Sequence, residues 1–284
     1  MNIQWFPGHM AKTRRLISEN LKLVDVVVEI LDARIPLSSA NPILPELLGD
    51  KPKVVVLNKA DMADENVTKK WIDFYKSDGV GVVAVSSISG KGIGVFKAAV
   101  DTVLAEKNRR RAEKGMKDVP AKMMIVGIPN VGKSSFINKL SGRAGTKTGD
   151  RPGVTMTKQW IRISGGYDLL DTPGILWPKF EDELTGQHLA FTGAIKDDIY
   201  DTEEAACLLC SFFAQNYPEV LKSAYKLSDI EGMDGYDILQ EIGRKRGCIV
   251  SGGNVNTERA AAILLNEFRG CKLGKISLEE PNML

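Results

Sequence analysis

Apolar residues in the first part of the chain form short runs, and stretches with helical spacing separate these runs. Buried runs of Val, Ile and Leu that alternate with amphipathic helices predict a parallel sheet covered on both faces. The predicted strands are 24–31, 53–57, 80–85, 122–126, 159–163 and 167–170, with helices near 66–76, 93–107 and 133–140. The fold class that follows is α/β, with a doubly wound, mostly parallel sheet and right-handed crossovers.

The pattern changes after position 177, where strand-like runs become scarce. Helical periodicity then dominates near 203–216, 218–225, 236–246 and 256–268. The length of 284 residues suggests about two domains, at roughly 150 residues per domain. We therefore expect residues 1–177 to form the α/β domain, with a basic N-terminal segment, and residues 178–284 to form a smaller all-α domain. The charged stretch 107–118 is interpreted as a linker or a frayed helix end.

The charge of the chain is divided unequally between the two predicted domains. Residues 1–177 hold 27 Lys and Arg against 18 Asp and Glu, a net +9, and the remainder holds 11 against 18, a net −7. A basic half favours a polyanionic partner, because Lys and Arg neutralise phosphates and release counterions. No RNA-recognition motif of the RNP type is present, so we expect RNA contacts through shape and phosphates. The expected contact residues are Lys12, Arg14, Arg15, Arg244, Lys245, Arg246, Arg259, Arg269 and Lys272.

The composition and the cysteine spacing bear on the cellular compartment and on whether the protein binds a membrane or zinc. Hydrophobic residues make up 43% of the chain, yet no apolar run approaches the roughly 18 residues of a membrane helix. The first ten residues do not resemble a secretory signal. The four cysteines do not make a disulfide scaffold, and the spacing of Cys207 and Cys210 favours two core residues of one helix over a zinc or redox site. We expect a cytoplasmic protein with no membrane partner and no zinc.

A phosphate-binding loop is predicted directly after the strand 122–126. Residues 127–134 read Gly-Ile-Pro-Asn-Val-Gly-Lys-Ser, which fits the pattern G-x-x-x-x-G-K-[ST] between a strand and a helix. Glycines allow backbone N–H groups to converge on phosphate oxygens at a helix N-terminus. Lys133 would reach the β- and γ-phosphates, and the Ser134 hydroxyl would bind Mg²⁺. The residues expected to contact the nucleotide here are Pro129, Asn130, Val131, Gly132, Lys133, Ser134 and Ser135.

Two further motifs follow strands and specify the base. Asn58-Lys59-Ala60-Asp61 follows the strand 53–57, and the Asp61 carboxylate can accept hydrogen bonds from N1–H and the 2-amino group of guanine. Adenine offers no such pair of donors, so the predicted ligand is GTP or GDP. The segment Ser86, Ser87 and Ile88 follows the strand 80–85 and can present a backbone N–H to the guanine carbonyl.

The γ-phosphate is expected to be sensed by two other segments. Asp171-Thr-Pro-Gly174 follows the strand 167–170, so that Asp171 can hold Mg²⁺ and the Gly174 N–H can face the γ-phosphate. Thr155 lies between the phosphate loop and Asp171, where it can close over the γ-phosphate and Mg²⁺. Lys133 and Thr155 are thus expected to act in catalysis.

The order of these motifs is unusual, since the guanine-reading motif and the serine loop precede the phosphate loop. The cyclic order is kept, so the same sheet can form from a permuted chain. This order resembles the circularly permuted GTPases. Together with Trp5-Phe-Pro-Gly-His9-Met10, Asp32-Ala-Arg34-Ile-Pro36 and a helical second domain, it is similar to the ribosome biogenesis GTPase A (YlqF/RbgA) type.

The resemblance implies a GTPase that acts in late maturation of the bacterial large ribosomal subunit, contacts rRNA and ribosomal proteins, and is activated by the particle. Ile175 stands where Ras-like enzymes have a glutamine, and the resemblance implies that His9 takes over that catalytic role. The alternative is that His9 caps a helix or contacts RNA. The resemblance also implies a K⁺ site at Asn130, against the alternative that Asn130 only supports the loop. The protein is expected to be monomeric.

Several alternatives stay open at this point. The target could be tRNA or the small subunit, or the chain could be a binding module whose nucleotide is not turned over. A metabolic phosphotransferase would use the same phosphate loop, but the motif at Asn58–Asp61 and the lack of an evident acceptor site argue against it. His188, in the helical region, is expected to be structural.

Overall fold

The computed structural model describes residues 10–116, 119–142, 160–163, 166–170 and 182–283, and it divides into two compact units. One unit contains residues 6–179 together with 277–284, and the other contains residues 180–276. The boundary near residue 180 lies close to the expected one at 177. The prediction that the helical domain continues to residue 284 is wrong for its last residues, because they hydrogen-bond to the α/β domain.

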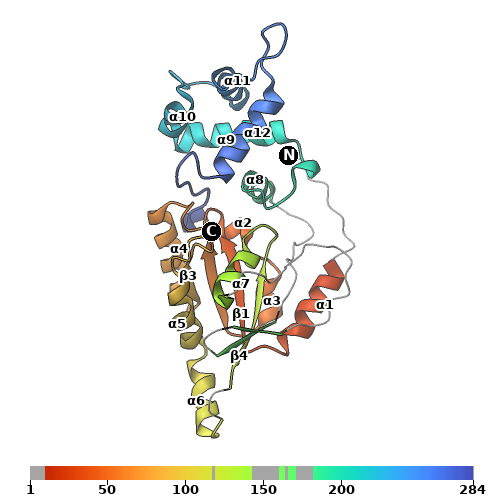
Figure 1. Ribbon diagram of the computed structural model, residues 1–284, viewed down its shortest axis with the longest axis vertical. Coiled ribbons are helices and arrows are strands. Elements are labelled where there is room, and N and C mark those ends of the chain that lie inside the picture. Colours follow the sequence, from red (N-terminus) through yellow and green to blue (C-terminus); the bar gives the residue numbers. More distant parts are fainter. Residues whose placement is uncertain (1–9, 117–118, 143–159, 164–165, 171–181, 284) are drawn as a thin grey trace. The chain divides into compact units, whose positions relative to one another are not determined.

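Six strands form one sheet in the first domain, in the order β3-β2-β1-β4-β6-β5 (Figure 1). All neighbouring pairs are parallel except β5 with β6, which is antiparallel. The strands are β1 (Val26–Asp32), β2 (Lys53–Asn58), β3 (Gly81–Ala84), β4 (Ala121–Gly127), β5 (Trp160–Ile163) and β6 (Tyr167–Leu170). Every residue of β1 is buried, as expected for a central parallel strand. The predicted doubly wound, mostly parallel sheet is confirmed.

Helices cover both faces of this sheet. On one face, alternate strand residues such as Val27 and Val55 pack against α1, α3 and α4. On the other face lie α5 and α7, whose Phe96 and Phe136 meet edge to face with ring centroids 5.1 Å apart. The helices are α1 (Met10–Leu21), α2 (Pro36–Ser39), α3 (Leu44–Leu48), α4 (Glu65–Ser77), α5 (Ile93–Val103), α6 (Ala105–Glu113) and α7 (Lys133–Ser141).

The expected helix 93–107 and the expected linker after it are corrected by the structure. The chain forms two helices, α5 and α6, which meet at Leu104. The charged second helix is held by ion pairs, since Glu106 pairs with Arg110 four residues on, and Arg111 and Lys107 both pair with Asp25 next to β1. The stretch is polar because it is a surface helix with no buried residue, rather than a linker.

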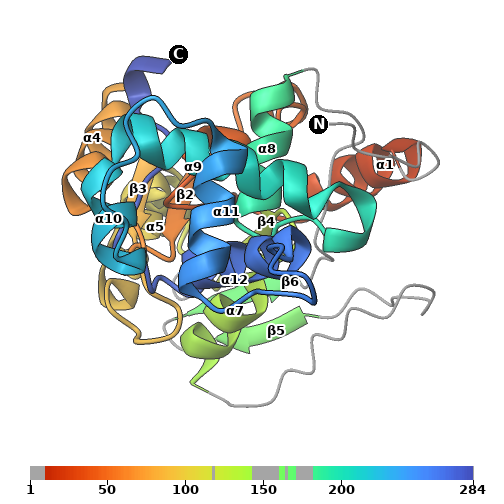
Figure 2. The same cartoon turned by 90° about the horizontal axis from the view of Figure 1, so that it is seen from above.

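The second domain is all helical, as predicted. It contains α8 (Glu183–Phe191), the 3₁₀ turn η2 (Asp197–Ile199), α9 (Thr202–Asn216), α10 (Pro218–Tyr225), α11 (Gly235–Lys245) and α12 (Thr257–Arg269). Figure 2 shows α9, α11 and α12 gathered in one bundle. Side chains of Asp182, Asp201, Asp234 and Asn256 cap the starts of α8, α9, α11 and α12, because they accept hydrogen bonds from first-turn N–H groups.

Burial in this domain bears on two predictions, one about His188 and one about Cys207 and Cys210. His188 is 1% exposed in α8, so the expectation that it is structural holds. Cys210 is fully buried in α9 and Cys207 is partly buried, and both thiols are free. Burial, with nearby acidic groups, raises the pKa of the Cys207 thiol to about 11. Neither thiol therefore has the low-pKa character of a redox cysteine.

Candidate guanine-nucleotide site

The carboxyl ends of the parallel strands bring the predicted motifs to one edge of the sheet. From β1 the chain moves outward to β2 and β3 on one side, and from β4 to β6 on the other. The crevice between the ends of β1 and β4 is therefore a topological switch point, where open α/β sheets bind ligands. The loop after β4 is the predicted phosphate loop, and the loops after β2 and β3 carry the guanine-reading motif and the serine segment.

The phosphate loop has the conformation that its sequence predicts. Strand β4 ends at Gly127 and helix α7 begins at Lys133, so the loop presents the N-terminus of a helix. Gly132 has φ +92°, and a Cβ atom there would lie 2.3 Å from the Asn58 side-chain nitrogen, so only glycine fits. The Nζ atom of Lys133 is shielded from solvent, whereas Asn130 is exposed.

Asn58 joins three loops of the site. Its side-chain nitrogen donates to the Val131 carbonyl of the phosphate loop at 2.7 Å. Its side-chain oxygen accepts from the backbone N–H of Ser87 at 3.1 Å and from the Ser87 hydroxyl at 2.7 Å. Asn58 is 2% exposed, so these bonds form away from water and fix the loops relative to one another. Asn58 is thus a connector between the loops in this structure.

Lys59 is engaged in an ion pair, whereas Asp61 lies at the surface. Lys59 forms an ion pair with Asp32 at 3.0 Å, and its backbone has φ +60°. Asp61 is exposed, so its carboxylate is accessible to a ligand from solvent. Ser86 is buried and Ile88 is 81% exposed, so the serine segment turns from the core to the surface between them.

Asp32, at the end of β1, is a site residue whose role the sequence did not reveal. Arg34 donates to its carboxylate through Nε at 2.9 Å and Nη2 at 2.7 Å, and Lys59 approaches from the other side. Burial acts to raise the pKa of Asp32, but the charges of Arg34 and Lys59 outweigh burial and lower it. The signal available in the sequence was an aspartate at the end of a strand next to β2, since Asp32 pairs in register with Asn58.

Four predicted functional residues lie outside the described residues. They are His9, Thr155, Asp171 and Gly174, and Ile175, at the position of the Ras-like glutamine, lies outside them as well. Ser134 is half-buried and Ser135 exposed in the first turn of α7, and Pro129 is half-buried in the loop before it. Among the described residues, no group of three or more His, Cys, Asp or Glu could hold a metal ion.

One expected RNA contact is corrected by the helical domain. Arg269 donates to the carbonyls of Ala190 and Phe191 at 2.8 and 3.1 Å and pairs with Asp197 at 2.8 Å. The Arg269 guanidinium therefore binds the C-terminal end of α8, and its hydrogen bonds are made within the helical domain. Arg244, Lys245, Arg259 and Lys272 are exposed, and Arg246 is partly used by Glu267 and by stacking on Tyr225. Arg14 and Arg15 are exposed on α1, and the side chain of Lys12 lies outside the described residues.

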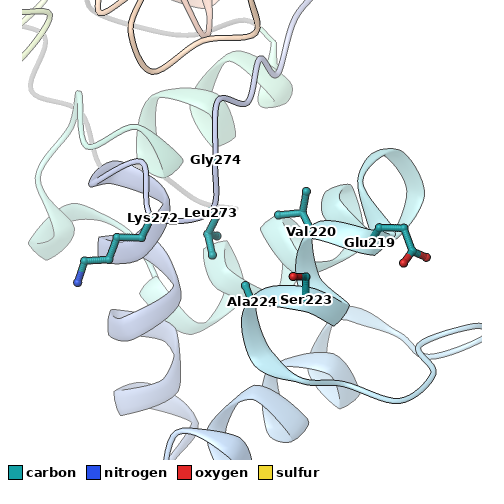
Figure 3. A pocket seen from close by; sticks show the side chains of 7 residues that line it. All are labelled: Glu219, Val220, Ser223, Ala224, Lys272, Leu273 and Gly274. Atoms are coloured by element: carbon teal, nitrogen blue, oxygen red, sulfur yellow. The ribbon is translucent and has the colours of Figure 1, made fainter.

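A hollow in the helical domain is a separate feature. It has a volume of about 450 Å³ between α10 and the segment after α12 (Figure 3). The two charged lining residues, Glu219 and Lys272, point away from each other and from the hollow, which is bounded by Val220, Ala224 and Leu273. It presents no convergent charge for a phosphate and is not a second nucleotide site.

Comparison with known proteins agrees with this geometry. A family model described as "50S ribosome-binding GTPase" matches residues 122–237, so the match begins at the phosphate-loop strand and leaves out the guanine-reading motif. Ribosome biogenesis GTPase A of Bacillus cereus is 48% identical over 99% of this chain and 95% of its own length. The protein of the same name from Thermotoga maritima is 31% identical over 98% of this chain and 95% of its own.

Solved structures show the same fold. The GDP-bound structure of TM YlqF matches with a TM-score of 0.67 and 28% identity, over 94% of this chain and 100% of that chain. The GNP-bound YlqF from T. maritima matches with a TM-score of 0.64 over 95% of this chain and 98% of that chain. The fold and the motif order define a circularly permuted P-loop GTPase. More narrowly, the chain belongs to the ribosome biogenesis GTPase A family.

The structure describes no helix that is long and apolar enough to cross a membrane.

Proposed function

We propose that this GTPase hydrolyses GTP during a late step in maturation of the bacterial large ribosomal subunit, and that the subunit stimulates hydrolysis. The observation that carries the proposal is the similarity of 48% over 99% of the chain, through both domains, to a protein named for ribosome biogenesis. The protein would work in the cytoplasm as a monomer, with rRNA and ribosomal proteins as partners. After hydrolysis it would leave the particle.

The chemistry of the site supports this role. Lys133, at the start of α7, would neutralise the β- and γ-phosphates, and its shielded Nζ places a charge where water competes least. Ser134 would hold Mg²⁺ together with Thr155 and Asp171, and Gly174 would contact the γ-phosphate. Mg²⁺ supplies neutralisation of the charge that develops on the phosphoryl oxygens. Asn130, exposed at the tip of the loop, would contribute to a K⁺ site.

Recognition of guanine would come from Asp61 and the serine segment. The Asp61 carboxylate accepts two hydrogen bonds from guanine, and the segment Ser86, Ser87 and Ile88 presents an N–H to the guanine carbonyl. Lys59, fixed by Asp32, would lie along the base. Asn58 hydrogen-bonds to Val131 of the phosphate loop and to Ser87 of the serine segment. One hydrogen-bond network would therefore position the groups that bind the base and those that bind the phosphates.

The helical domain would help to bind rRNA through its exposed cations. Arg244 and Lys245 end α11, and Arg259 and Lys272 lie on and after α12. Such contacts neutralise phosphates without reading bases. Among the helical-domain cations expected from the sequence, Arg269 is left out, for the reason given above.

The test is phosphate release from GTP in KCl, with and without purified large subunits, for the wild type and for His9→Ala. We expect stimulation by the large subunit that is lost in the variant, because Ile175 cannot orient water and His9 would do so. Small subunits and tRNA serve as controls. Stimulation by those controls alone would contradict the large-subunit assignment, and stimulation that survives in the variant would remove His9 from the mechanism. Replacing KCl by NaCl tests the K⁺ proposal in the same assay.

A further inference from the structure

The end of the chain returns to the α/β domain and buries a carboxylate there. Glu279 is 2% exposed, and its carboxylate accepts hydrogen bonds from the backbone N–H groups of Leu37 at 2.6 Å and Ser38 at 3.1 Å. The Ser38 hydroxyl donates to the same carboxylate. Leu37 and Ser38 belong to the short helix α2, which follows Arg34 by two residues. A buried carboxylate needs hydrogen-bond donors, so loss of these contacts would raise the free energy of the folded protein.

Neighbouring residues of this tail, residues 277–283, contact the loops next to the guanine-reading motif. The Leu278 N–H donates to the Arg34 carbonyl at 2.8 Å. The Ser277 hydroxyl oxygen accepts from the Asp64 N–H at 3.1 Å, at the point where α4 begins after the Asn58–Asp61 motif. The Trp71 indole of α4 donates to the Glu279 carbonyl at 3.1 Å. In Figure 1 the 3₁₀ turn η3 (Pro281–Met283) lies beside α4.

A short series of contacts connects this tail to Lys59. The Leu278 N–H donates to the Arg34 carbonyl. The Nε and Nη2 atoms of Arg34 donate to the Asp32 carboxylate at 2.9 and 2.7 Å. Asp32 in turn holds Lys59 at 3.0 Å. Arg34 and Asp32 are each 2% exposed, so the contact between them is shielded from water.

We propose that the C-terminal tail is a positioning element for the guanine end of the nucleotide site. Glu279 is the positioning residue: it fixes the tail on α2, so that the adjacent Leu278 contacts Arg34, which reaches Lys59 through Asp32. The inference rests on the proposed guanine recognition at Asn58–Asp61, and it does not depend on the ribosomal partner. Because Ser277 follows Ile276 directly, the last residue of the helical unit is one peptide bond from this element.

The test uses the full chain and equilibrium titration with a fluorescent GDP, with competition by unlabelled GDP and inosine diphosphate. Inosine lacks the 2-amino group, so the preference for GDP reports how well Asp61 is placed. For Glu279→Gln we expect the Kd for GDP to rise by about tenfold, the size of one weakened charge-assisted hydrogen bond, and the preference over inosine diphosphate to fall. The matched control is Glu280→Gln, whose carboxylate pairs with the exposed Lys70, and it should leave both values unchanged.

A second variant tests the series of contacts. Asp32→Asn should lower the same preference, and combining it with Glu279→Gln should cost less than the product of the two single effects, because both act on Lys59. If Glu279→Gln fails to fold, Ser277→Ala, which removes one acceptor, carries the test with a smaller rise in Kd. An unchanged Kd and preference in Glu279→Gln would overturn the proposal. So would an equal loss for both nucleotides, since that marks general loosening. Failure of the wild type to bind GDP would instead contradict the nucleotide site itself.

Discussion

Asn58 in the α/β domain and Asn256 in the helical domain are both polar residues at the ends of elements, yet they are used differently. Asn58 bonds to two other loops, through Val131 and Ser87, and is fully buried. Asn256 accepts one hydrogen bond from Arg259, three residues on, and caps its own helix. The site of the first domain therefore depends on long-range polar contacts at Asn58, whereas the start of α12 in the second domain is capped locally. We therefore expect a change at Asn58 to affect both stability and nucleotide binding, and a change at Asn256 to affect stability alone.

The largest expected effect concerns Asp61, whose exposed carboxylate is the proposed reader of the base. In Asp61→Asn one acceptor becomes a donor, so guanine loses a partner while xanthine, with a carbonyl at position 2, gains one. We expect GDP affinity to fall by about 100-fold or more and xanthosine diphosphate affinity to rise, because a mispaired polar group is strongly rejected. Equilibrium binding of both nucleotides measures this. Asp73→Asn, on the exposed face of α4, is the control, and equal GDP binding in the two variants would argue against Asp61 as the base reader.

The next effect is on stability. Asp32→Asn leaves Arg34 and Lys59 without their shared carboxylate, and breaking such a buried pair costs about 3–5 kcal/mol in the free energy of unfolding. Because the pKa of Asp32 is lowered in the folded protein, its contribution is complete above the unfolded pKa of about 4 and is lost as pH falls further. Urea unfolding of wild type and variant at pH 7 and pH 3 should show a gap that narrows at pH 3. A gap that widens with acid would contradict the assigned network.

The two asparagines test the comparison directly. Asn58→Ala leaves the buried Val131 carbonyl and Ser87 N–H without their partner, which should cost about 2–4 kcal/mol and weaken GDP binding. Asn256→Ala removes one helix cap and should cost about 1 kcal/mol, with GDP binding unchanged. Urea denaturation and GDP titration of both variants give the four values. Similar losses of GDP affinity would mean that the helical domain is coupled to the site more tightly than its local contacts indicate.

The last prediction compares Arg269 with two exposed cations of the helical domain, Arg244 and Lys245. Arg269→Gln should cost about 2 kcal/mol because the carbonyls of Ala190 and Phe191 lose their donor. Replacing Arg244 and Lys245 by Gln should change stability by less than about 0.5 kcal/mol, since both are exposed. The double variant should bind large subunits more weakly, with a salt dependence reduced by about two charges. Unchanged subunit binding in the double variant would remove α11 from the proposed RNA surface.

Much of the first domain could be predicted from local sequence. The strands were found because buried parallel strands read as continuous apolar runs, and the phosphate loop was found because its glycines and Lys133 stand in a fixed pattern. The helices α1, α2, α3 and α8 were not predicted. The two short ones, α2 and α3, have a proline in their first two positions and are too short to show a helical apolar periodicity.

The contacts that position the site could not be found in this way. Glu279 meets Ser38 across 241 positions of sequence, and nothing near Glu279 marks it as different from Glu280. Arg269 looked like a surface cation because its partners, Ala190 and Asp197, lie far away in the chain. In the sequence, Asp32 stands out only as part of a family motif, although its position at the end of a strand beside Asn58 has a direct physical meaning. Polar contacts between residues that lie far apart in the chain do not produce a recognisable pattern in the local sequence.

We propose that guanine recognition at Asp61 controls a GTPase that the large subunit activates. The most direct measurement is phosphate release by Asp61→Asn with GTP and with xanthosine triphosphate, each with and without large subunits. We expect stimulation by the subunit to transfer from GTP to xanthosine triphosphate in the variant, while the wild type responds only with GTP. Stimulation of the variant by subunits with GTP as strong as in the wild type would contradict this proposal.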